Sequence, residues 1–254
     1  MEQSAKHNNE VISQFTQQAV PFTKLSGHLD SVDLLIKMSA VNEKDTVLDV
    51  ASGPGLVATA FAKVANHVEC LDLTPAMLDQ AKQQALANNI ANMSFREGDA
   101  MTLPYEDESF DTVITRYSFH HFLKPEQVLS EMIRVCKPKG CVLVADVAIQ
   151  SKYSEIFNHI ERLRDSSHVH ALSIDELNRL FTQSSLKDCR KSEYTVNVEL
   201  EQQLQASFPT PDGKISIRGL ITDDVDINKT GFNPELIKGN VHYSYPISIY
   251  VGIK

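Results

Sequence analysis

The sequence predicts an α/β fold, a doubly wound and mostly parallel sheet that ends in an antiparallel hairpin. Three observations lead to this prediction. Short apolar runs alternate with helical patterns over residues 31–149, a turn of small residues ("ASGPG", 51–55) follows the first apolar run, and two long segments of alternating polarity lie near the end of the chain. Alternation of this kind is typical of parallel strands that helices cover on both faces.

The elements follow one another in a regular order. Residues 32–40 carry apolar side chains at helical spacing, and the β-rich run "TVLDVA" comes next. Thr74 is placed to cap a helix that has Pro75 at its first position. "KPKG" (137–140) is the predicted turn before the last of these strands. The predicted strands are 46–51, 67–73, 93–100, 110–118 and 140–149, and the predicted helices are 31–41, 56–65, 75–86 and 126–136.

The C-terminal part of the chain is expected to be organised differently. "LKDCRKSEYTVNVEL" (186–200) and "HYSYPISIYVGIK" (242–254) alternate like strands, and we expect them to form the antiparallel hairpin. The stretch between them is too long for a bare hairpin loop. We therefore predict one domain made of residues 1–198 and 241–254, with 199–240 as an insertion that covers the active site. The Pro, Gly and Asp residues of this insertion are also typical of a mobile surface loop, which is the alternative.

Composition limits the classes of function. With 42% hydrophobic and 22% charged residues, the 254-residue chain has the composition of a soluble globular protein. Lys and Arg number 24 against 33 Asp and Glu, and the net charge of −9 argues against nucleic-acid and membrane partners. We see no signal core and no apolar stretch that could span a membrane. The four cysteines form no C-x-x-C pair, so we expect reduced thiols and a cytoplasmic protein.

Open parallel sheets bind ligands at the carboxyl ends of their strands, and the polar motifs of this chain fall at those ends. Gly53 and Gly55 lie after the first strand, where the chain turns sharply with a ligand against its backbone. Asp72 ends the second strand and is placed to accept hydrogen bonds from two ribose hydroxyls. Together these residues predict a nucleoside site.

Two classes of cofactor fit this pattern. Gly53, Gly55 and Ala58 match G-x-G-x-x-A, the dinucleotide fingerprint, so an NAD(P)-binding oxidoreductase is one alternative. Pro54 removes an N–H from the turn that would hold phosphate, and no later segment has the pattern of a nicotinamide domain. These two observations favour a ligand without phosphate.

Four motifs, taken in order, resemble those of a known family. They are "VLDVASGPG", "CLDLTPAMLDQA", "FREGDAMTLPYEDESFDTVITRYSFHHF" and "VLSEMIRVCKPKGCVLVAD". They are similar to the motifs of class I S-adenosylmethionine-dependent methyltransferases of the type 11 group, and of the ubiquinone/menaquinone C-methyltransferases in particular. The resemblance runs from about Val47 to Asp146, and "ERLRDSSHVHALSIDELNRLF" and "YVGIK" resemble a narrower bacterial branch. Ala51 stands where many members have a glycine, as it does in the quinone methyltransferases.

The resemblance implies S-adenosylmethionine as the cofactor and S-adenosylhomocysteine as the product. Asp49 and the backbone from Ala51 to Gly55, including Gly53, would face the methionine part of the cofactor. Asp72 would hold the ribose, and the main chain of Arg116 would hold the methionine amino group. The alternative for Asp49 is that it only orients the glycine turn.

The adenine site is implied in the same way. Leu73 and Met77 would pack on the adenine ring, Asp99 would accept a hydrogen bond from its exocyclic amine, and Ala100 would offer a backbone N–H. Met77 could equally be a core residue of its helix, and Asp99 an ordinary loop acid.

Methyl transfer from a sulfonium chiefly needs alignment, but a hydroxyl or carbon acceptor must also lose a proton. Histidine has a suitable pKa for this role, and His121 is the predicted general base. His120, Arg164 and His168 are predicted to line the acceptor site. The alternatives are that the two adjacent histidines pack a helix start, and that Arg164 pairs with Glu161 on its own helix.

The predicted function is the transfer of a methyl group to a small, partly polar or anionic molecule by in-line displacement. A non-catalytic S-adenosylmethionine-binding protein is a further alternative. No metal is expected, because the H-x-H pattern of His168 and His170 has no third ligand at a sensible spacing. The acceptor, the methylated atom and the oligomeric state are not determined by the sequence.

Overall fold

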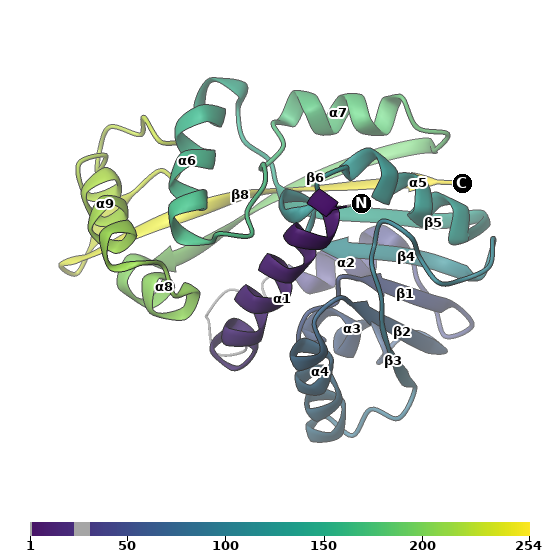
Figure 1. Ribbon diagram of the computed structural model, residues 1–254. Helices are drawn as coiled ribbons and strands as arrows, with labels where there is room; N and C mark the ends of the chain where they lie inside the picture. The colour runs from purple at the N-terminus through teal and green to yellow at the C-terminus, as the bar shows by residue number, and fades with distance from the viewer. Residues whose placement is uncertain (1, 23–30) are drawn as a thin grey trace.

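The parallel part of the sheet follows from the crossover helices, because each helix returns the chain before the next strand begins. The computed structural model describes residues 2–22 and 31–254. Its sheet has the strand order β3-β2-β1-β4-β5-β8-β6, and β7 pairs with β8 outside this path (Figure 1). The strands are β1 (Thr46–Val50), β2 (His67–Asp72), β3 (Met93–Glu97), β4 (Phe110–Arg116), β5 (Cys136–Val147), β6 (Lys187–Glu199), β7 (Glu235–Ile237) and β8 (Asn240–Ile253).

Strands β1 to β5 pair only in parallel with one another, and Asp49 of β1 lies opposite Cys70 of β2 and Ile114 of β4. β8 runs antiparallel to both β5 and β6. The predicted fold class is therefore confirmed, including its C-terminal antiparallel hairpin. Because the carboxyl ends of parallel strands meet at one edge, the loops after β1, β2, β3 and β4 come together there.

The helices connect the strands, and α1 is a long helix that was not predicted. Figure 1 shows α3 and α4 beside β1, β2 and β3, with α8 and α9 at the other end of the molecule. Between these groups runs α1, which packs against α4 and α8. The helices are α1 (Glu2–Phe22), α2 (Val32–Ser39), α3 (Leu56–Phe61), α4 (Pro75–Ala87), α5 (Pro125–Val135), α6 (Ser154–Arg164), α7 (Ile174–Thr182), α8 (Leu200–Ser207) and α9 (Pro211–Thr222), with the short 3₁₀ helices η1 (Phe119–His121) and η2 (Ser151–Tyr153).

The predicted turn at 137–140 lies inside β5, where the strand forms a bulge. Lys139 has a positive φ of 66°, and the pairing of β4 with β5 shifts register nearby. Lys139 N donates to Lys254 O at 2.9 Å, and Lys254 N donates to Gly140 O at 3.0 Å. These two hydrogen bonds tie the bulge to the end of the chain, and local turn chemistry does not reveal such a contact.

The insertion at 199–240 shares the hydrophobic core of the domain. Phe232 stacks on Phe157 of α6, with the ring centroids 4.1 Å apart. Leu204 of α8 and Ile221 of α9 belong to the same buried cluster as apolar residues of the sheet. The insertion also supplies β7, which pairs with β8. Its removal would therefore open the hydrophobic core.

A further observation concerns the helices as a whole. Over residues 2–22 and 31–254, no helix combines the length and the apolar character that a lipid bilayer crossing requires.

The cysteines are not linked in disulfides. Cys70, Cys136 and Cys141 are buried free thiols, and Cys189 is an exposed one. Burial raises the pKa of Cys136 and of Cys141 to about 12, so both remain protonated near neutral pH.

Candidate functional site

The turn after β1 holds three residues with positive φ: Ala51 at 54°, Gly53 at 53° and Gly55 at 75°. A Cβ on Gly53 would meet no atom within 4 Å, whereas a Cβ on Gly55 would lie 2.7 Å from Ala81 Cβ. Gly53 therefore leaves open space beside the turn. Gly55 instead lets the start of α3 approach α4.

Asp72 joins the carboxyl ends of β1 and β2. Its Oδ2 accepts a hydrogen bond from Gly53 N at 2.7 Å, and its Oδ1 accepts one from Thr74 N at 2.8 Å. Thr74 occupies the predicted N-cap position of α4, but its hydroxyl makes no capping hydrogen bond. Burial raises the pKa of Asp72 to about 6, against the lowering effect of the two backbone N–H groups.

A cavity with an empty volume of about 1020 Å³ lies at the carboxyl edge of the sheet, and we call it the first cavity. Its lining includes Ser52 and Thr74, whose hydroxyl oxygens are buried and make no hydrogen bond of ordinary geometry within the described residues. The walls thus leave polar groups for a ligand to satisfy. The predicted cofactor residues that line it are Ala51, Gly53, Asp72, Leu73, Met77, Asp99, Ala100 and Arg116.

Asp49 is not among the lining residues of the first cavity and lies behind the turn. Its side chain is buried, and Oδ2 has no hydrogen-bond partner in the part of the chain that the structure describes. Burial raises its pKa to about 7, Arg116 lowers it and Asp72 raises it. A buried carboxyl group with an incomplete set of partners is unfavourable, and such groups are typical of functional sites.

Helix α1 covers the first cavity. Asn8 Nδ2 donates to Asp99 Oδ2 at 2.9 Å, so α1 is tied to the predicted adenine site. Phe15 lines the cavity and meets the ring of His121 edge-on at a centroid distance of 5.0 Å. These α1 residues were missed by sequence reasoning. The apolar side chains within 11–19 have helical spacing, and that signal could have indicated the helix.

The loop after β4 is strained next to the same cavity. Tyr117 has a positive φ of 56°, and the Arg116 guanidinium lies 4.5 Å from the centroid of its ring. Tyr117 Oη lies 2.8 Å from Tyr194 Oη of β6. A left-handed conformation costs a residue with a side chain about 1–2 kcal/mol, and both Ala51 and Tyr117 adopt it on this wall. Backbone strain of this kind clusters at functional sites.

A second cavity, with an empty volume of about 650 Å³, adjoins the first and shares Phe15, Tyr117 and His121 with it. Its walls come from α1, α6, α8, β6 and β8 as well as from the loops of the sheet. Two ligands could therefore lie side by side with a common wall. The other residues that line the second cavity are Gln18, His120, Val147, Glu161, Arg164, Asp165, Val196, Val198, Gln203, Tyr245 and Ile247.

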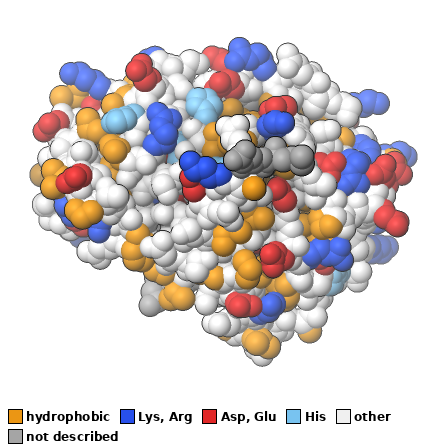
Figure 2. Space-filling view, viewed as in Figure 1, with side chains coloured by type: hydrophobic (Ala, Val, Ile, Leu, Met, Phe, Trp, Pro, Cys, Tyr) orange, Lys and Arg blue, Asp and Glu red, His pale blue; other side chains and the backbone are white. Residues whose placement is uncertain are grey.

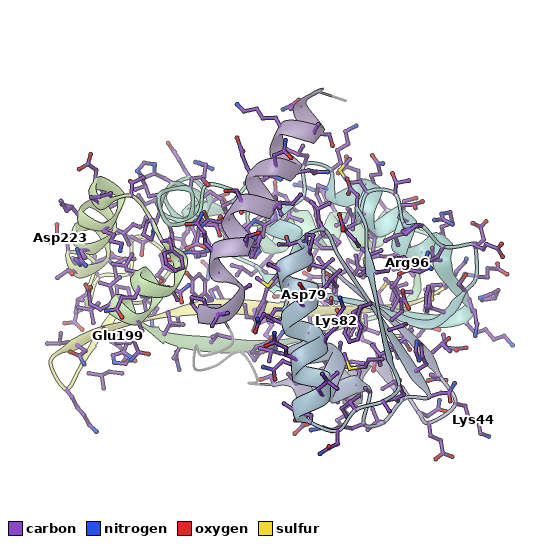
Figure 3. The ribbon with its side chains drawn as sticks, turned by 60° about the horizontal axis from the view of Figure 1, so that its bottom comes forward. Lys44, Asp79, Lys82, Arg96, Glu199 and Asp223 are labelled. Atoms are coloured by element: carbon purple, nitrogen blue, oxygen red, sulfur yellow. The ribbon has the colours of Figure 1, made fainter. Side chains whose placement is uncertain are left out.

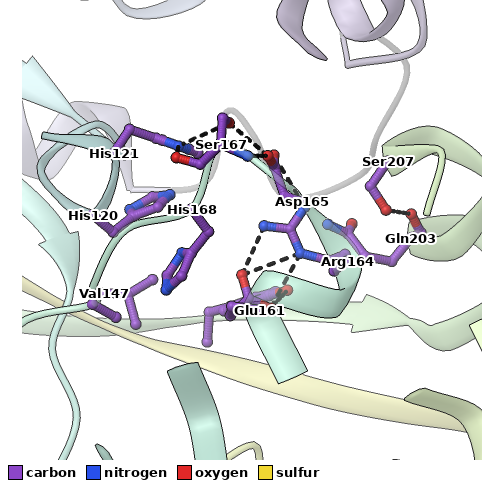
Figure 4. Close-up of polar contacts among 12 residues, drawn as sticks. His120, His121, Val147, Glu161, Arg164, Asp165, Ser167, His168, Gln203 and Ser207 are labelled. Atoms are coloured by element: carbon purple, nitrogen blue, oxygen red, sulfur yellow. Dashed lines mark hydrogen bonds and ion pairs between the residues drawn. The ribbon is translucent and has the colours of Figure 1, made fainter. Parts of the chain in front are cut away.

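Arg164 lines the second cavity, but acidic side chains neutralise its charge. Its Nη2 donates to Glu161 Oε2 at 2.7 Å, and its Nη1 lies 3.9 Å from Asp165 Oδ2. Figure 4 shows the guanidinium between these two acidic side chains. Tyr245 Oη donates to Glu161 Oε1 at 3.0 Å and completes the network. The pairing of Arg164 with Glu161, which the sequence left as an alternative, is the arrangement in the structure.

His120 and His121 lie side by side but have different partners (Figure 4). Nδ1 of His120 lies 2.7 Å from Asp146 Oδ1, whereas Nδ1 of His121 lies 3.1 Å from the carbonyl oxygen of Ser167. Burial lowers the pKa of His120, but Asp146 outweighs it and the pKa is raised. Burial and the neighbouring His120 lower the pKa of His121 to about 4.

His168 lies beside the second cavity and is not one of its lining residues. Its Nε2 is 2.7 Å from Asn158 Oδ1, and burial lowers its pKa well below the ordinary value. Nε2 of His170 is 3.2 Å from Glu176 Oε2, so the two histidines have separate partners. Within residues 2–22 and 31–254, no group of three or more His, Cys, Asp or Glu side chains is arranged to hold a metal ion.

The chain is similar in sequence to known methyltransferases. A family model described as a methyltransferase domain matches residues 48–144. An uncharacterized methyltransferase of Bacillus subtilis, YcgJ, is 33% identical over 159 residues, which are 62% of this chain and 63% of that protein. A demethylmenaquinone methyltransferase of Deinococcus radiodurans is 42% identical over 102 residues, or 39% of this chain and 42% of that protein. The chain thus spans less than two thirds of these curated relatives.

Solved structures extend the likeness to most of the chain. The crystal structure of YcgJ from Bacillus subtilis superimposes with a TM-score of 0.81 at 27% identity. The superposition covers 89% of this chain and 99% of that one. The similarity therefore extends well beyond the matched domain.

Proposed function

We propose that this chain, whose residues 48–144 match a methyltransferase domain, transfers the methyl group of S-adenosylmethionine to a small-molecule acceptor. The observation that carries this proposal is the pair of cavities that share Phe15, Tyr117 and His121. One cavity is lined by the carboxyl-edge loops of the matched domain. A transferase must hold two substrates with their reacting atoms in contact, and adjoining cavities support that requirement.

The residues of the first cavity fit the proposed cofactor. In this proposal Asp72 binds the ribose hydroxyls and Asp99 the adenine amine, because both residues line the first cavity and carboxylate oxygens accept hydrogen bonds from both kinds of donor. The open space beside Gly53 leaves room for a ligand close to the backbone. In this proposal Leu73 and Met77 contact the adenine, and Ala100 offers its N–H to the same ring. Ala51 and Arg116 lie toward the methionine part, with Asp49 behind them.

The second cavity supports a small acceptor that is partly polar. Its walls combine aliphatic side chains with the network of Glu161, Arg164 and Asp165, and the arginine charge is already paired. Because its charge is already paired, Arg164 gives no support for an anionic acceptor. Figure 2 shows Lys and Arg side chains scattered among acidic ones on one face, and the net charge is −9. Both observations favour a small molecule over a nucleic acid.

The proposed reaction is an in-line displacement. When bound, the sulfonium of the cofactor supplies an activated methyl group. The residues of the chain bind and orient: the loops of the first cavity hold the nucleoside, and the second cavity holds the acceptor against the shared wall. Phe15 and Tyr117 on that wall exclude water from the contact between the two ligands.

We also propose that the protein works in the cytoplasm. The free thiols of Cys70, Cys136 and Cys141 are buried, and nothing in their arrangement calls for an oxidising compartment. Expression of the chain with a fluorescent tag in a bacterial cell, followed by fractionation, tests this location. Recovery of the tagged protein from the periplasm or the membrane would contradict it.

Calorimetric titration tests the proposed cofactor directly. We expect S-adenosylhomocysteine to bind the full chain and NAD to show no heat of binding at the same concentration. Tight NAD binding without S-adenosylhomocysteine binding would favour the oxidoreductase alternative. Binding of S-adenosylhomocysteine in a chain that transfers no methyl group to any of a broad set of small acceptors would favour the non-catalytic alternative.

A further inference from the structure

We propose that His120, oriented by Asp146, is the general base of the reaction. The acceptor would then enter the second cavity with a dissociable proton on the atom that receives the methyl group. This inference rests on the proposed methyl transfer. It moves the role of base from His121, which the sequence favours, to the adjacent residue.

The contacts of Asp146 fix the tautomer of His120. Asp146 is buried near the end of β5, and its carboxylate accepts hydrogen bonds from Phe119 N at 2.5 Å and from Val147 N at 2.6 Å. Its Oδ1 lies 2.7 Å from Nδ1 of His120. Because a carboxylate only accepts hydrogen bonds, Nδ1 carries the proton and the lone pair is on Nε2.

The side chain of His120 is part of the wall of the second cavity. His120 lines this cavity, and its Nε2 makes no hydrogen bond within the described residues. An imidazole held through Nδ1 by a buried carboxylate, with Nε2 open to a substrate, is the arrangement by which an acidic residue orients a histidine base and stabilises its imidazolium form. The pair therefore has both the geometry and the charge to receive a proton.

Nδ1 of His121 has a different kind of partner from Nδ1 of His120. Its Nδ1 lies 3.1 Å from the carbonyl oxygen of Ser167, which bears no charge, and its ring meets Phe15 edge-on. Its pKa is lowered to about 4, so it holds a proton poorly near neutral pH. His168, whose ring centroid is 5.5 Å from that of His120, also has a lowered pKa. A proton taken up by this cluster therefore resides on His120.

The charged groups around His120 come from β5 and α6. Burial lowers its pKa, Asp146 raises it through charge and a hydrogen bond, Glu161 raises it, and Arg164 lowers it. The net result is a raised pKa, so His120 accepts a proton more readily than His121 does. Loss of Asp146 would leave burial and Arg164 to dominate, and the pKa of His120 would fall.

The proposed step is balanced in atoms and electrons. As the acceptor atom bonds to the methyl carbon, its proton passes to Nε2 of His120. The bond between that carbon and the sulfonium sulfur breaks, and its electron pair stays on the sulfur as a neutral thioether. His120 becomes an imidazolium paired with Asp146 and then releases the proton to water. One proton is released for each methyl group transferred to a neutral acceptor.

Nitrogen-15 NMR of histidine-labelled protein, saturated with S-adenosylhomocysteine, tests the base without an acceptor. We expect the His120 signal to show a protonated Nδ1 and a free Nε2, and to titrate at a higher pH than His121. Asp146→Asn should lower the pKa of His120, and the signal of the exposed His159 serves as the internal reference. A His120 with its proton on Nε2, or one that titrates below His121, would overturn the proposal.

Turnover separates a catalytic role from a structural one. Acceptors are screened with S-adenosylmethionine among small hydroxyl compounds, carbon acids and amines. We expect His120→Gln to lower kcat about a hundredfold or more, to remove the acidic limb of the pH profile and to leave the affinity for S-adenosylhomocysteine unchanged. His121→Gln should lower kcat less, and His159→Gln should leave it unchanged. Wild-type kcat in His120→Gln would overturn the proposal, as would acceptance of amines alone.

The two proposals fail in different ways. If the wild-type chain does not bind S-adenosylhomocysteine, the proposed function fails. If it binds and transfers methyl groups but His120→Gln does so equally well, only the assignment of the base fails. Circular dichroism of each variant shows whether a loss of activity comes from a loss of fold.

Discussion

The two cavities of this molecule are built in different ways. The first is lined mainly by loops that follow β1, β2, β3 and β4, all within one stretch of the chain. The second gathers side chains from α1, α6, α8, β6 and β8, which are far apart in sequence. Gln18 Nε2, for example, donates to Asp165 Oδ2 across 147 positions. The first cavity thus depends on strand order, and the second depends on how the ends of the chain pack.

The polar groups of the two cavities also have different partners. In the first, Asp72 is held by backbone N–H groups, and the hydroxyl oxygens of Ser52 and Thr74 make no hydrogen bond of ordinary geometry among the described residues. In the second, Glu161 and Arg164 are held by each other. The first cavity thus leaves polar groups for a ligand to satisfy, whereas the polar side chains of the second already satisfy one another. This contrast can be tested by variants of each wall.

The largest effect is expected from the two glycines of the turn. Gly55→Ala should destabilise the fold by about 3 kcal/mol, because the new methyl group overlaps Ala81 and the left-handed backbone disfavours a side chain. Gly53→Ala has open space around it and should cost about 1–2 kcal/mol. Urea unfolding measures the difference. Equal losses in the two variants would mean that the packing against α4 is unimportant.

A strong effect on binding is expected at Asp72. Asp72→Ala removes a charge-assisted acceptor, which typically costs about 1.5–3 kcal/mol, or roughly a ten- to hundredfold weaker affinity for S-adenosylhomocysteine. Asp79→Ala is the matched control, because Asp79 lies on the outside of α4 with Lys82 as its partner (Figure 3). Titration calorimetry measures both. An unchanged affinity in Asp72→Ala would contradict the proposed nucleoside site.

The pH dependence of stability should follow Asp49 and Asp72. Burial raises their pKa values to about 7 and about 6, so the folded ligand-free chain binds more protons than the unfolded chain above about pH 4. Stability from these groups is therefore present at low pH and is lost as the pH rises through 6 and 7. Asp49→Asn should flatten this slope by about 1.4 kcal/mol per pH unit between about pH 5 and 7. Thermal unfolding across this range checks the sign.

The smallest effect is expected where α1 meets the first cavity. Asn8→Ala removes the hydrogen bond to Asp99 and should loosen α1 by about 1 kcal/mol. Asn9→Ala is the matched control, since Asn9 is exposed on the same helix. Hydrogen exchange of the α1 amides, followed by mass spectrometry, compares the two variants. If both exchange at the wild-type rate, α1 is held by its apolar face alone.

The sequence by itself determined the fold class and the position of the first cavity. Strand and helix periodicity is a local property, and small residues at a positive φ leave a direct trace in the sequence. Asp72 and the residues from Ala51 to Gly55 could therefore be placed at the carboxyl edge from the residue pattern alone. Parallel strand order then brought Asp99 and Arg116 to the same edge.

Only the tertiary structure decided the rest of the site. Which of two adjacent histidines meets a carboxylate depends on Asp146, 26 positions away on β5. The position of α1 over the first cavity depends on contacts such as the hydrogen bond from Gln14 Nε2 to Ser207 O, which joins residues 193 positions apart. Side-chain patterns report burial and local conformation, but they carry no signal for the particular partner that a polar group meets across the molecule. The first cavity could be predicted for this reason. For the second, the sequence predicted His120, His121 and Arg164 but not the walls that α1, β6 and β8 contribute.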